Sequence, residues 1–180
     1  MKKLLILPGN SQRNQAWGEA CAEFFSTQFD EIYLQYYDHW ETGEPVIDVS
    51  VELDKILAIT ESATDKDEWY ICAKSVGSLV ALIAMQEDII NPVKCIFFGM
   101  PLDGAAEELF KDDWSALTDF AVPTLVFHND NDPIANFAFT EAKIKEVGQD
   151  FIFKKLSDNT HDYLDFPAYK TEIENFWSWQ

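Results

Sequence analysis

Short apolar runs and longer mixed segments follow one another along the chain. Runs rich in β-branched and large apolar residues, bounded by turn residues, predict buried strands, and the segments between them predict helices. The predicted strands cover residues 3–7, 31–36, 68–73, 93–98, 123–128 and 151–155. The predicted helices cover residues 13–27, 50–63, 76–87, 136–147 and 167–179, and a mixed segment covers residues 103–120.

The alternation of strands and helices determines the expected fold class. It predicts an α/β fold in three layers, with a predominantly parallel sheet covered by helices on both faces. No low-complexity linker or internal repeat divides the chain. Because 180 residues are enough to bury a substantial core, we expect a single domain over residues 1–180.

Composition indicates a folded and strongly acidic protein. Hydrophobic residues make up 47% of the chain and aromatic residues 14%, which argues against a disordered polypeptide. The formal net charge is −19 at pH 7, and a field of this sign repels nucleic acids and anionic membranes at long range. We therefore expect neither a nucleic-acid partner nor a membrane partner.

The first residues are similar to a signal peptide only superficially. Two lysines precede the apolar run, but only four apolar residues separate them from Pro8, fewer than such a peptide needs. No apolar run approaches the ~20 residues required to cross a bilayer. We therefore expect a cytoplasmic protein. The three cysteines (Cys21, Cys72 and Cys95) lack metal-ligand spacing, and in that compartment we expect free thiols rather than a disulfide.

A serine occupies the junction between a predicted strand and a predicted helix. The segment Trp69-Tyr-Ile-Cys-Ala-Lys-Ser75-Val-Gly77 leads an apolar strand into Ser75, and an apolar helix begins directly afterwards. This is the layout of a nucleophile elbow, G-x-S-x-G, with Ala73 in the first glycine position. Small residues are needed two positions before and after the serine, because strand and helix backbones nearly touch there. An ordinary strand–loop–helix connection that happens to contain serine is the alternative.

An acid and a histidine follow later strands. Asp132 lies four residues past His128, the end of a predicted strand, and Asp130 lies in the same loop. His161 lies in the polar loop after the strand at 151–155. The chain order Ser, Asp, His is the order of the catalytic triad in α/β-hydrolases and differs from the other two known serine-triad orders.

With these motifs, nearly the whole chain resembles a small α/β-hydrolase with little or no lid. The segment Leu4-Leu-Ile-Leu-Pro8-Gly9-Asn10-Ser11 resembles the first strand and oxyanion loop of that family, with Pro8 in place of the usual histidine. The resemblance implies a six-stranded sheet in the order 2-1-3-4-5-6. The ligand crevice would open between strands 1 and 3, where the strand order reverses.

The acid and histidine loops carry the same resemblance. Phe127-His-Asn-Asp-Asn-Asp132-Pro resembles the acid loop, with Asn129 in place of a glycine, and this alignment places the acid on Asp132. Asn159-Thr-His161-Asp162 resembles the histidine loop, with Thr160 in the glycine position. Asp130 is the reserve acid, and its alternative interpretation is a loop-capping turn.

The resemblance implies a serine esterase that acts on a small acyl substrate. In this hypothesis Ser75 attacks the acyl carbonyl, His161 takes its proton and Asp132 orients the imidazole. The backbone N–H groups of Asn10 and Val76 would hold the oxyanion.

Ser11 and Lys74 are candidate substrate contacts. The alternative interpretation of Lys74 is a side chain that points to solvent or pairs with a nearby acid. His39 has no motif around it and is interpreted as a loop residue, and His128 has a structural role in the family. These scattered histidines form no metal signature, and no dinucleotide or Walker pattern occurs, so we expect no metal and no cofactor.

Two segments could shape a pocket. The polar, aromatic segment 38–45 is predicted as a loop, and residues 103–120 form either a small flap or a cover for the sheet.

Two other functions remain open. The substitutions at Ala73, Asn129 and Thr160 motivate a catalytically inactive binding protein with a basic partner. The alternation alone also permits a flavodoxin-like ligand binder, which leaves the serine, acid and histidine unexplained.

Overall fold

A single six-stranded sheet forms the centre of the computed structural model, which describes residues 1–61, 64, 66–111, 113–147, 149 and 151–178. All neighbouring strands are parallel. The strands are β1 (Lys2–Leu7), β2 (Glu31–Leu34), β3 (Glu68–Lys74), β4 (Lys94–Phe98), β5 (Thr124–Asn129) and β6 (Ile152–Leu156). Their spatial order, β2-β1-β3-β4-β5-β6, confirms the predicted strand order and the α/β fold class.

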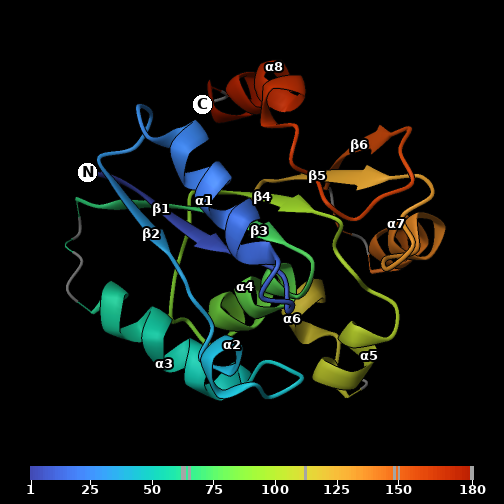
Figure 1. Cartoon of the computed structure of the whole chain (residues 1–180), viewed down its shortest axis with the longest axis horizontal. Helices are drawn as coiled ribbons and strands as arrows, with labels where there is room; N and C mark the ends of the chain where they lie inside the picture. Colours follow the sequence, from blue (N-terminus) through green and yellow to red (C-terminus); the bar gives the residue numbers. More distant parts are fainter. Residues whose placement is uncertain (62–63, 65, 112, 148, 150, 179–180) are drawn as a thin grey trace.

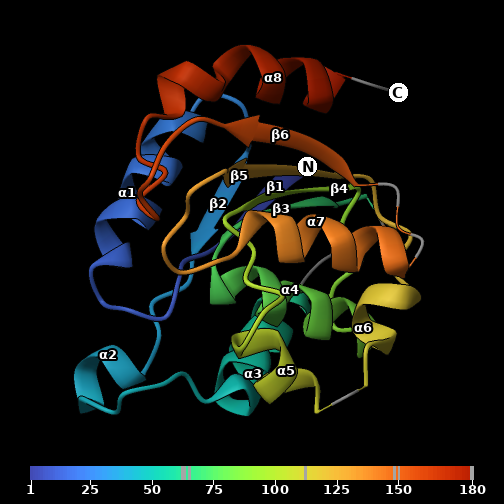
Figure 2. The ribbon, with the colours of Figure 1, turned by 90° about the vertical axis from the view of Figure 1, so that its right-hand side faces the viewer.

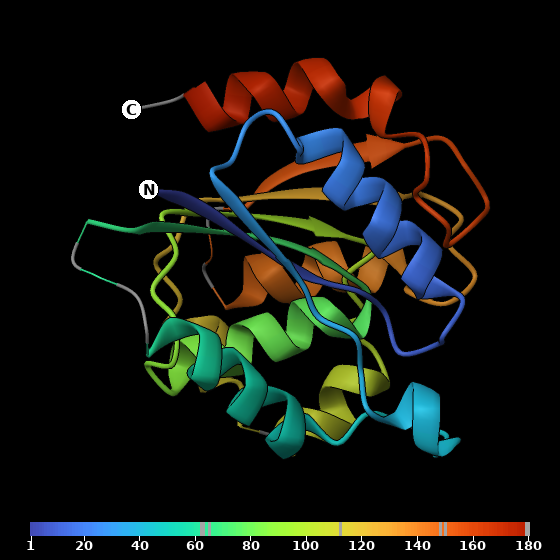
Figure 3. The same ribbon diagram turned by 60° about the vertical axis from the view of Figure 1, so that its left-hand side comes forward.

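Helices cover both faces of this sheet (Figures 1 and 2). One face carries α1 (Asn14–Phe25) and α8 (Phe166–Ser178). The other face carries α3 (Val49–Thr60), α4 (Val76–Gln86), α5 (Ala105–Phe110), α6 (Ser115–Thr118) and α7 (Phe137–Glu146). The short helix α2 (His39–Thr42) follows β2 and stands apart from both layers (Figure 3).

The central strands are apolar on both faces, so each face builds its own core. In β1, Leu5 and Leu7 join the cluster formed with α3 and α4. Leu4 and Ile6 point the other way and join the cluster of Trp17 from α1 and helix α8. This two-sided burial accounts for the continuous apolar runs in the sequence, because a parallel sheet is covered by helices on both sides.

The predicted strands and helices correspond closely to those of the structure. Predicted helix positions 62–63 and 179 lie outside the described residues. Two segments add detail: residues 38–45, predicted as a loop, include α2, and residues 103–120 form α5 and α6. Phe110, Leu117 and Phe120 of that second segment are buried in the core, so the segment covers the sheet.

The described part of the chain also answers two composition questions. None of its helices is both long and apolar enough to cross a bilayer. Cys21, Cys72 and Cys95 are buried and free, and the sulfur atoms of Cys21 and Cys72 lie 3.4 Å apart.

The start of α4 is pressed against the end of β1. A Cβ atom built on Gly77 would lie 2.2 Å from the carbonyl oxygen of Leu7 and 2.4 Å from that of Pro8. Both atoms belong to the backbone and cannot rotate away. Ala73, at the other small position, is fully buried in β3. The glycine expected two residues after Ser75 is therefore required by a backbone-to-backbone approach.

We expect Gly77→Ala to lower the free energy of unfolding by about 3 kcal/mol, because the added methyl group overpacks against backbone. This loss outweighs the gain of about 1 kcal/mol from the better helix propensity of alanine. The matched control is Gly43→Ala, where φ is 79° but no atom lies within 4 Å of the added Cβ. There only the left-handed backbone costs energy, about 1 kcal/mol. Urea unfolding measures both, and equal losses would contradict the steric explanation.

Candidate active site

Ser75 lies in a strained turn between β3 and α4. Its backbone has φ 53° and ψ −130°, a conformation that residues other than glycine rarely adopt. The turn is held by a hydrogen bond of 2.8 Å from the Ser75 N–H to the Phe98 carbonyl at the end of β4. Strain of this kind persists only where the surrounding structure enforces it, and it is a feature of the nucleophile elbow.

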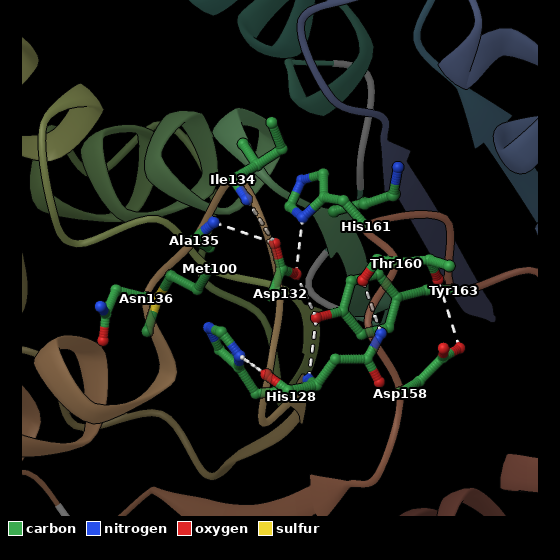
Figure 4. A network of polar contacts seen from close by, with 12 residues as sticks. Met100, His128, Asp132, Ile134, Ala135, Asn136, Asp158, Thr160, His161 and Tyr163 are labelled. Carbon is green, nitrogen blue, oxygen red and sulfur yellow. Dashed lines mark hydrogen bonds and ion pairs between the residues drawn. The ribbon is translucent and has the colours of Figure 1, made fainter.

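Asp132 and His161 are joined by a hydrogen bond. His161 Nδ1 donates to Asp132 Oδ2 at 2.7 Å, and the Asp132 side chain is fully buried (Figure 4). When the imidazole carries one proton, this hydrogen bond holds that proton on Nδ1 and leaves Nε2 as the lone-pair atom. Nε2 is buried and has no hydrogen-bond partner among the described residues. The ring thus has the tautomer that a general base requires.

The acid carries more hydrogen bonds than the one from His161. Its other oxygen, Oδ1, accepts from the N–H groups of Ile134 and Ala135, both at 2.9 Å. Tyr163 donates its hydroxyl proton to Oδ2 at 2.6 Å. Burial opposes ionisation of Asp132, but these hydrogen bonds outweigh it and lower the pKa of the carboxyl group to about 2.

Asp130, the reserve acid, has other partners. Its carboxylate accepts from the side-chain amide of Asn131 at 2.9 Å and lies 3.7 Å from the Lys155 ammonium. It makes no hydrogen bond to His161 in the described structure. Of the two carboxylates in this loop, Asp132 is therefore the one that the fold brings to His161.

The serine and the histidine both lie next to the end of β4. Ser75 binds the Phe98 carbonyl, and the next residue, Gly99, lies under the His161 ring. A Cβ atom on Gly99 would come within 2.9 Å of His161 Cε1 and 2.6 Å of Tyr163 Cε2. Gly99 also has φ 56°. Absence of a side chain here lets the histidine loop close over the strand end next to the serine.

The loop after β1 completes one side of the site. A Cβ atom on Gly9 would lie 3.1 Å from the Cβ of Ser75, so this loop passes directly beside the serine. The backbone N–H groups of Asn10 and Val76 donate no hydrogen bond to the described residues. Val76 is the first residue of α4, where the helix dipole adds positive potential. Neither donor of the expected oxyanion hole thus has a partner among the described residues, and Val76 directly follows Ser75.

Asn10 is held in place by the segment that contains α2. Its carbonyl accepts two hydrogen bonds, from His39 Nε2 at 2.7 Å and from Trp40 Nε1 at 2.6 Å. Its side chain donates to the Pro45 carbonyl and accepts from the N–H of Ile47. His39, interpreted as a loop residue, is instead the first residue of α2, and its buried ring anchors the loop after β1.

Lys74, beside the nucleophile, is buried rather than exposed to solvent. Its ammonium group donates to Oδ1 of Asn14, and only 3% of the residue is exposed. Burial lowers the pKa of Lys74 to about 8, although the carboxylates of Asp162 and Asp132 oppose this change. Ser11, the other candidate contact, is exposed at the start of the same loop as Asn10.

Two residues of the site carry interactions that the motifs alone did not predict. Tyr163 has no counterpart in the motif pattern, and only its position two residues after the histidine hinted at it. His128 is fully buried and donates from Nδ1 to the Asn129 carbonyl at 3.1 Å. Burial lowers the pKa of His128, which fits a structural role. In the described parts of the chain no three His, Cys, Asp or Glu residues are grouped so as to hold a metal ion.

Comparison with known proteins identifies the fold. No model of a protein family matches the chain, and no curated protein matches it by sequence. Among solved structures, a serine hydrolase without a lid from Xanthomonas campestris has a TM-score of 0.72 at 16% identity, covering 98% of this chain and 82% of its own. A lipase-esterase related protein from Clostridium acetobutylicum has a TM-score of 0.69 at 16% identity, covering 97% and 94%.

A mouse α/β-hydrolase domain-containing protein is similar to the same degree. Its TM-score is 0.69 at 13% identity, and the match covers 97% of this chain and 89% of the mouse chain. The chain therefore has the α/β-hydrolase fold, as the motifs implied. Its relation to these proteins is one of structure, because the identities are low.

Burial of Lys74 predicts a pH dependence of stability. Between pH 8 and 10.5 the folded protein has released the Lys74 proton while the unfolded chain still holds it, so stability rises with pH. Relative to Lys74→Met, we expect wild type to gain up to about 3 kcal/mol of unfolding free energy across this window. Lys145→Met, at an exposed lysine, controls for net charge. Parallel curves for wild type and Lys74→Met would contradict the burial of a charge at this position.

Proposed function

We propose that the protein is a serine hydrolase that cleaves a small carboxylic ester or thioester, with Ser75 as nucleophile, His161 as general base and Asp132 as its acid. The observation that carries the proposal is the 2.7 Å bond between Asp132 and His161, placed over the strand end that also fixes Ser75. The fold shared with hydrolases such as the lidless enzyme of Xanthomonas campestris supports the same reaction class.

The reaction follows from these positions. Ser75 Oγ attacks the acyl carbon while His161 Nε2 takes the hydroxyl proton, and Asp132 stabilises the imidazolium that forms. The carbonyl oxygen becomes an oxyanion between the N–H groups of Asn10 and Val76, each worth roughly 3–4 kcal/mol. His161 then gives its proton to the departing alcohol or thiol. Water, activated by the same histidine, releases the acid and restores the serine.

Charge and surface chemistry favour an uncharged, apolar substrate. The net charge of −19 disfavours an anionic ligand at long range, and the one cation next to the nucleophile, Lys74, is buried. Ile134, whose N–H binds Asp132, is 63% exposed, and Leu164, three residues after His161, is 52% exposed. The same groups can also cleave an amide, because only the leaving group differs. Amide substrates are therefore included in the substrate tests.

We expect a fluorophosphonate probe to label Ser75, with the adduct located by mass spectrometry, and labelling to be lost in Ser75→Ala and His161→Ala. p-Nitrophenyl acetate and butyrate should be hydrolysed in a Ser75-dependent manner. Asp132→Asn should reduce kcat by roughly 100- to 10,000-fold, because it leaves the histidine in the wrong tautomer. Asp130→Asn is the matched control and should retain wild-type turnover.

Absence of labelling and turnover in a well-folded wild-type protein would reject the hydrolase. It would leave the alternative of an inactive, hydrolase-like binding protein, for which the acidic surface favours a basic partner.

The hydrogen bonds that His39 and Trp40 donate to the Asn10 carbonyl give a separate prediction. Trp40→Phe keeps an aromatic ring but removes the Nε1 donor to the Asn10 carbonyl, so the oxyanion N–H is less firmly oriented. We expect kcat to fall roughly tenfold with little change in KM, less than for loss of a donor itself. Tyr36→Phe, at an exposed neighbouring aromatic residue, is the control. Equal kinetics in the two variants would show that the hydrogen bond from Trp40 to the Asn10 carbonyl is not needed for turnover.

A further inference from the structure

The Tyr163 hydroxyl group shares one carboxylate oxygen with the His161 imidazole. His161 Nδ1 and the hydroxyl both donate to Oδ2 of Asp132, at 2.7 and 2.6 Å (Figure 4). The hydroxyl also accepts a hydrogen bond of 3.0 Å from the N–H of Asn129, the last residue of β5. Because the N–H group occupies a lone pair of the phenol, the phenolic proton is directed to the acid.

Packing and hydrogen bonds hold Tyr163 in place, so the fold itself positions its hydroxyl group against Asp132. Only 2% of Tyr163 is exposed, and its backbone adopts φ 52°. Its carbonyl accepts from Trp17 Nε1 at 3.1 Å, and its ring packs against Phe98 and the His161 ring. Gly99 leaves the space in which the ring lies. A structural tyrosine would need the packing but not a proton directed at the catalytic acid.

We propose that Tyr163 is a positioning residue that holds Asp132 in place and withdraws part of its negative charge from His161, so that the imidazole stays neutral, and available to accept a proton, down to a lower pH. The inference rests on the proposed function where it concerns turnover. The effect of Tyr163 on the titration of His161 does not depend on that function. A donor on a carboxylate stabilises the charge there and weakens its attraction for a neighbouring imidazolium. Removing the hydroxyl group should therefore raise the pKa of His161.

Other titratable groups near His161 do not replace this effect. Burial raises the pKa of Tyr163 well above its ordinary value, so the hydroxyl remains a donor. Lys74 acts electrostatically on Asp132, but with a pKa of about 8 it loses its charge on the alkaline side. His128 interacts with both Asp132 and His161, and burial lowers its pKa. Asp162, next to the histidine, is exposed to solvent.

The test is an NMR titration of the His161 imidazole in the folded protein, with the resonance assigned by its loss in His161→Ala. In Tyr163→Phe we expect the midpoint to rise by about 0.5–1 pH unit. In Tyr169→Phe, which removes a hydroxyl from the same core cluster, we expect no change. An unchanged or lower midpoint in Tyr163→Phe would overturn the proposal. A merely structural role would lower stability and leave the midpoint in place.

A second variant covers the case in which Tyr163→Phe fails to fold. Replacement of Tyr163 by a ring-fluorinated tyrosine makes the phenol a stronger donor, and the midpoint should then move down instead of up. A midpoint that stays or rises would overturn the inference. The acid limb of kcat/KM should shift in parallel where wild type turns over esters. Because the NMR midpoint needs no turnover, failure of this inference is distinguishable from failure of the proposed function, which fluorophosphonate labelling of wild type decides.

Discussion

The contact between Gly77 and the carbonyl oxygens of Leu7 and Pro8 is the constraint from which the site follows. It joins the first turn of α4 to the end of β1 at a separation that only a residue without a side chain allows. Since β1 and β3 are neighbours at the point where the strand order reverses, this contact brings the loops after both strands together. One loop carries the N–H of Asn10, and the other carries Ser75 in a strained turn followed by the N–H of Val76, and neither N–H donates to a residue that the structure describes. The carbonyl and the side chain of Asn10 have partners that hold its loop in place.

A second centre, the Asp132 carboxylate, organises the other half of the site. It accepts four hydrogen bonds, two from backbone N–H groups of its own loop and two from side chains of the histidine loop. In a protein with a net charge of −19, a fully buried carboxylate needs such local compensation, because the surrounding field opposes its ionisation. Among the described residues, the donors meet that need without a lysine or arginine in direct contact. As a result, the negative charge faces His161, and the imidazole is the only one of the four donors that can take up a proton.

The fold and the main site residues could be predicted from the sequence because both depend on local signals. Apolar runs and their alternation with helical segments determine a parallel sheet, and the elbow at Ser75 and the acid and histidine loops each follow a strand end. The anchoring residues were less accessible. His39 and Trp40 lie in a polar, aromatic segment without periodicity, and only the three-dimensional path of the chain brings them to Asn10. Lys74 is a charged residue at the end of β3, yet it is buried, and its ammonium group donates to Asn14, the first residue of α1. A buried tryptophan or tyrosine needs a partner for its polar atom, so the density of such residues in 36–40 was the available hint.

One departure from the family motifs is itself tied into the site. Asn129 and Thr160 both stand where the motifs have glycine, and the side-chain amide of Asn129 donates to the backbone carbonyl of Thr160 at 2.8 Å. The asparagine side chain thus links the end of β5 to the histidine loop directly, in the place where Tyr163 also binds the Asn129 N–H, whereas the Thr160 hydroxyl donates to Asp158. Ala73 adds one methyl group at a fully buried position of β3, and the turn at Ser75 still forms. The Asp132–His161 hydrogen bond therefore persists despite the altered motifs, because the side chain of Asn129 ties the end of β5 to the loop that carries His161.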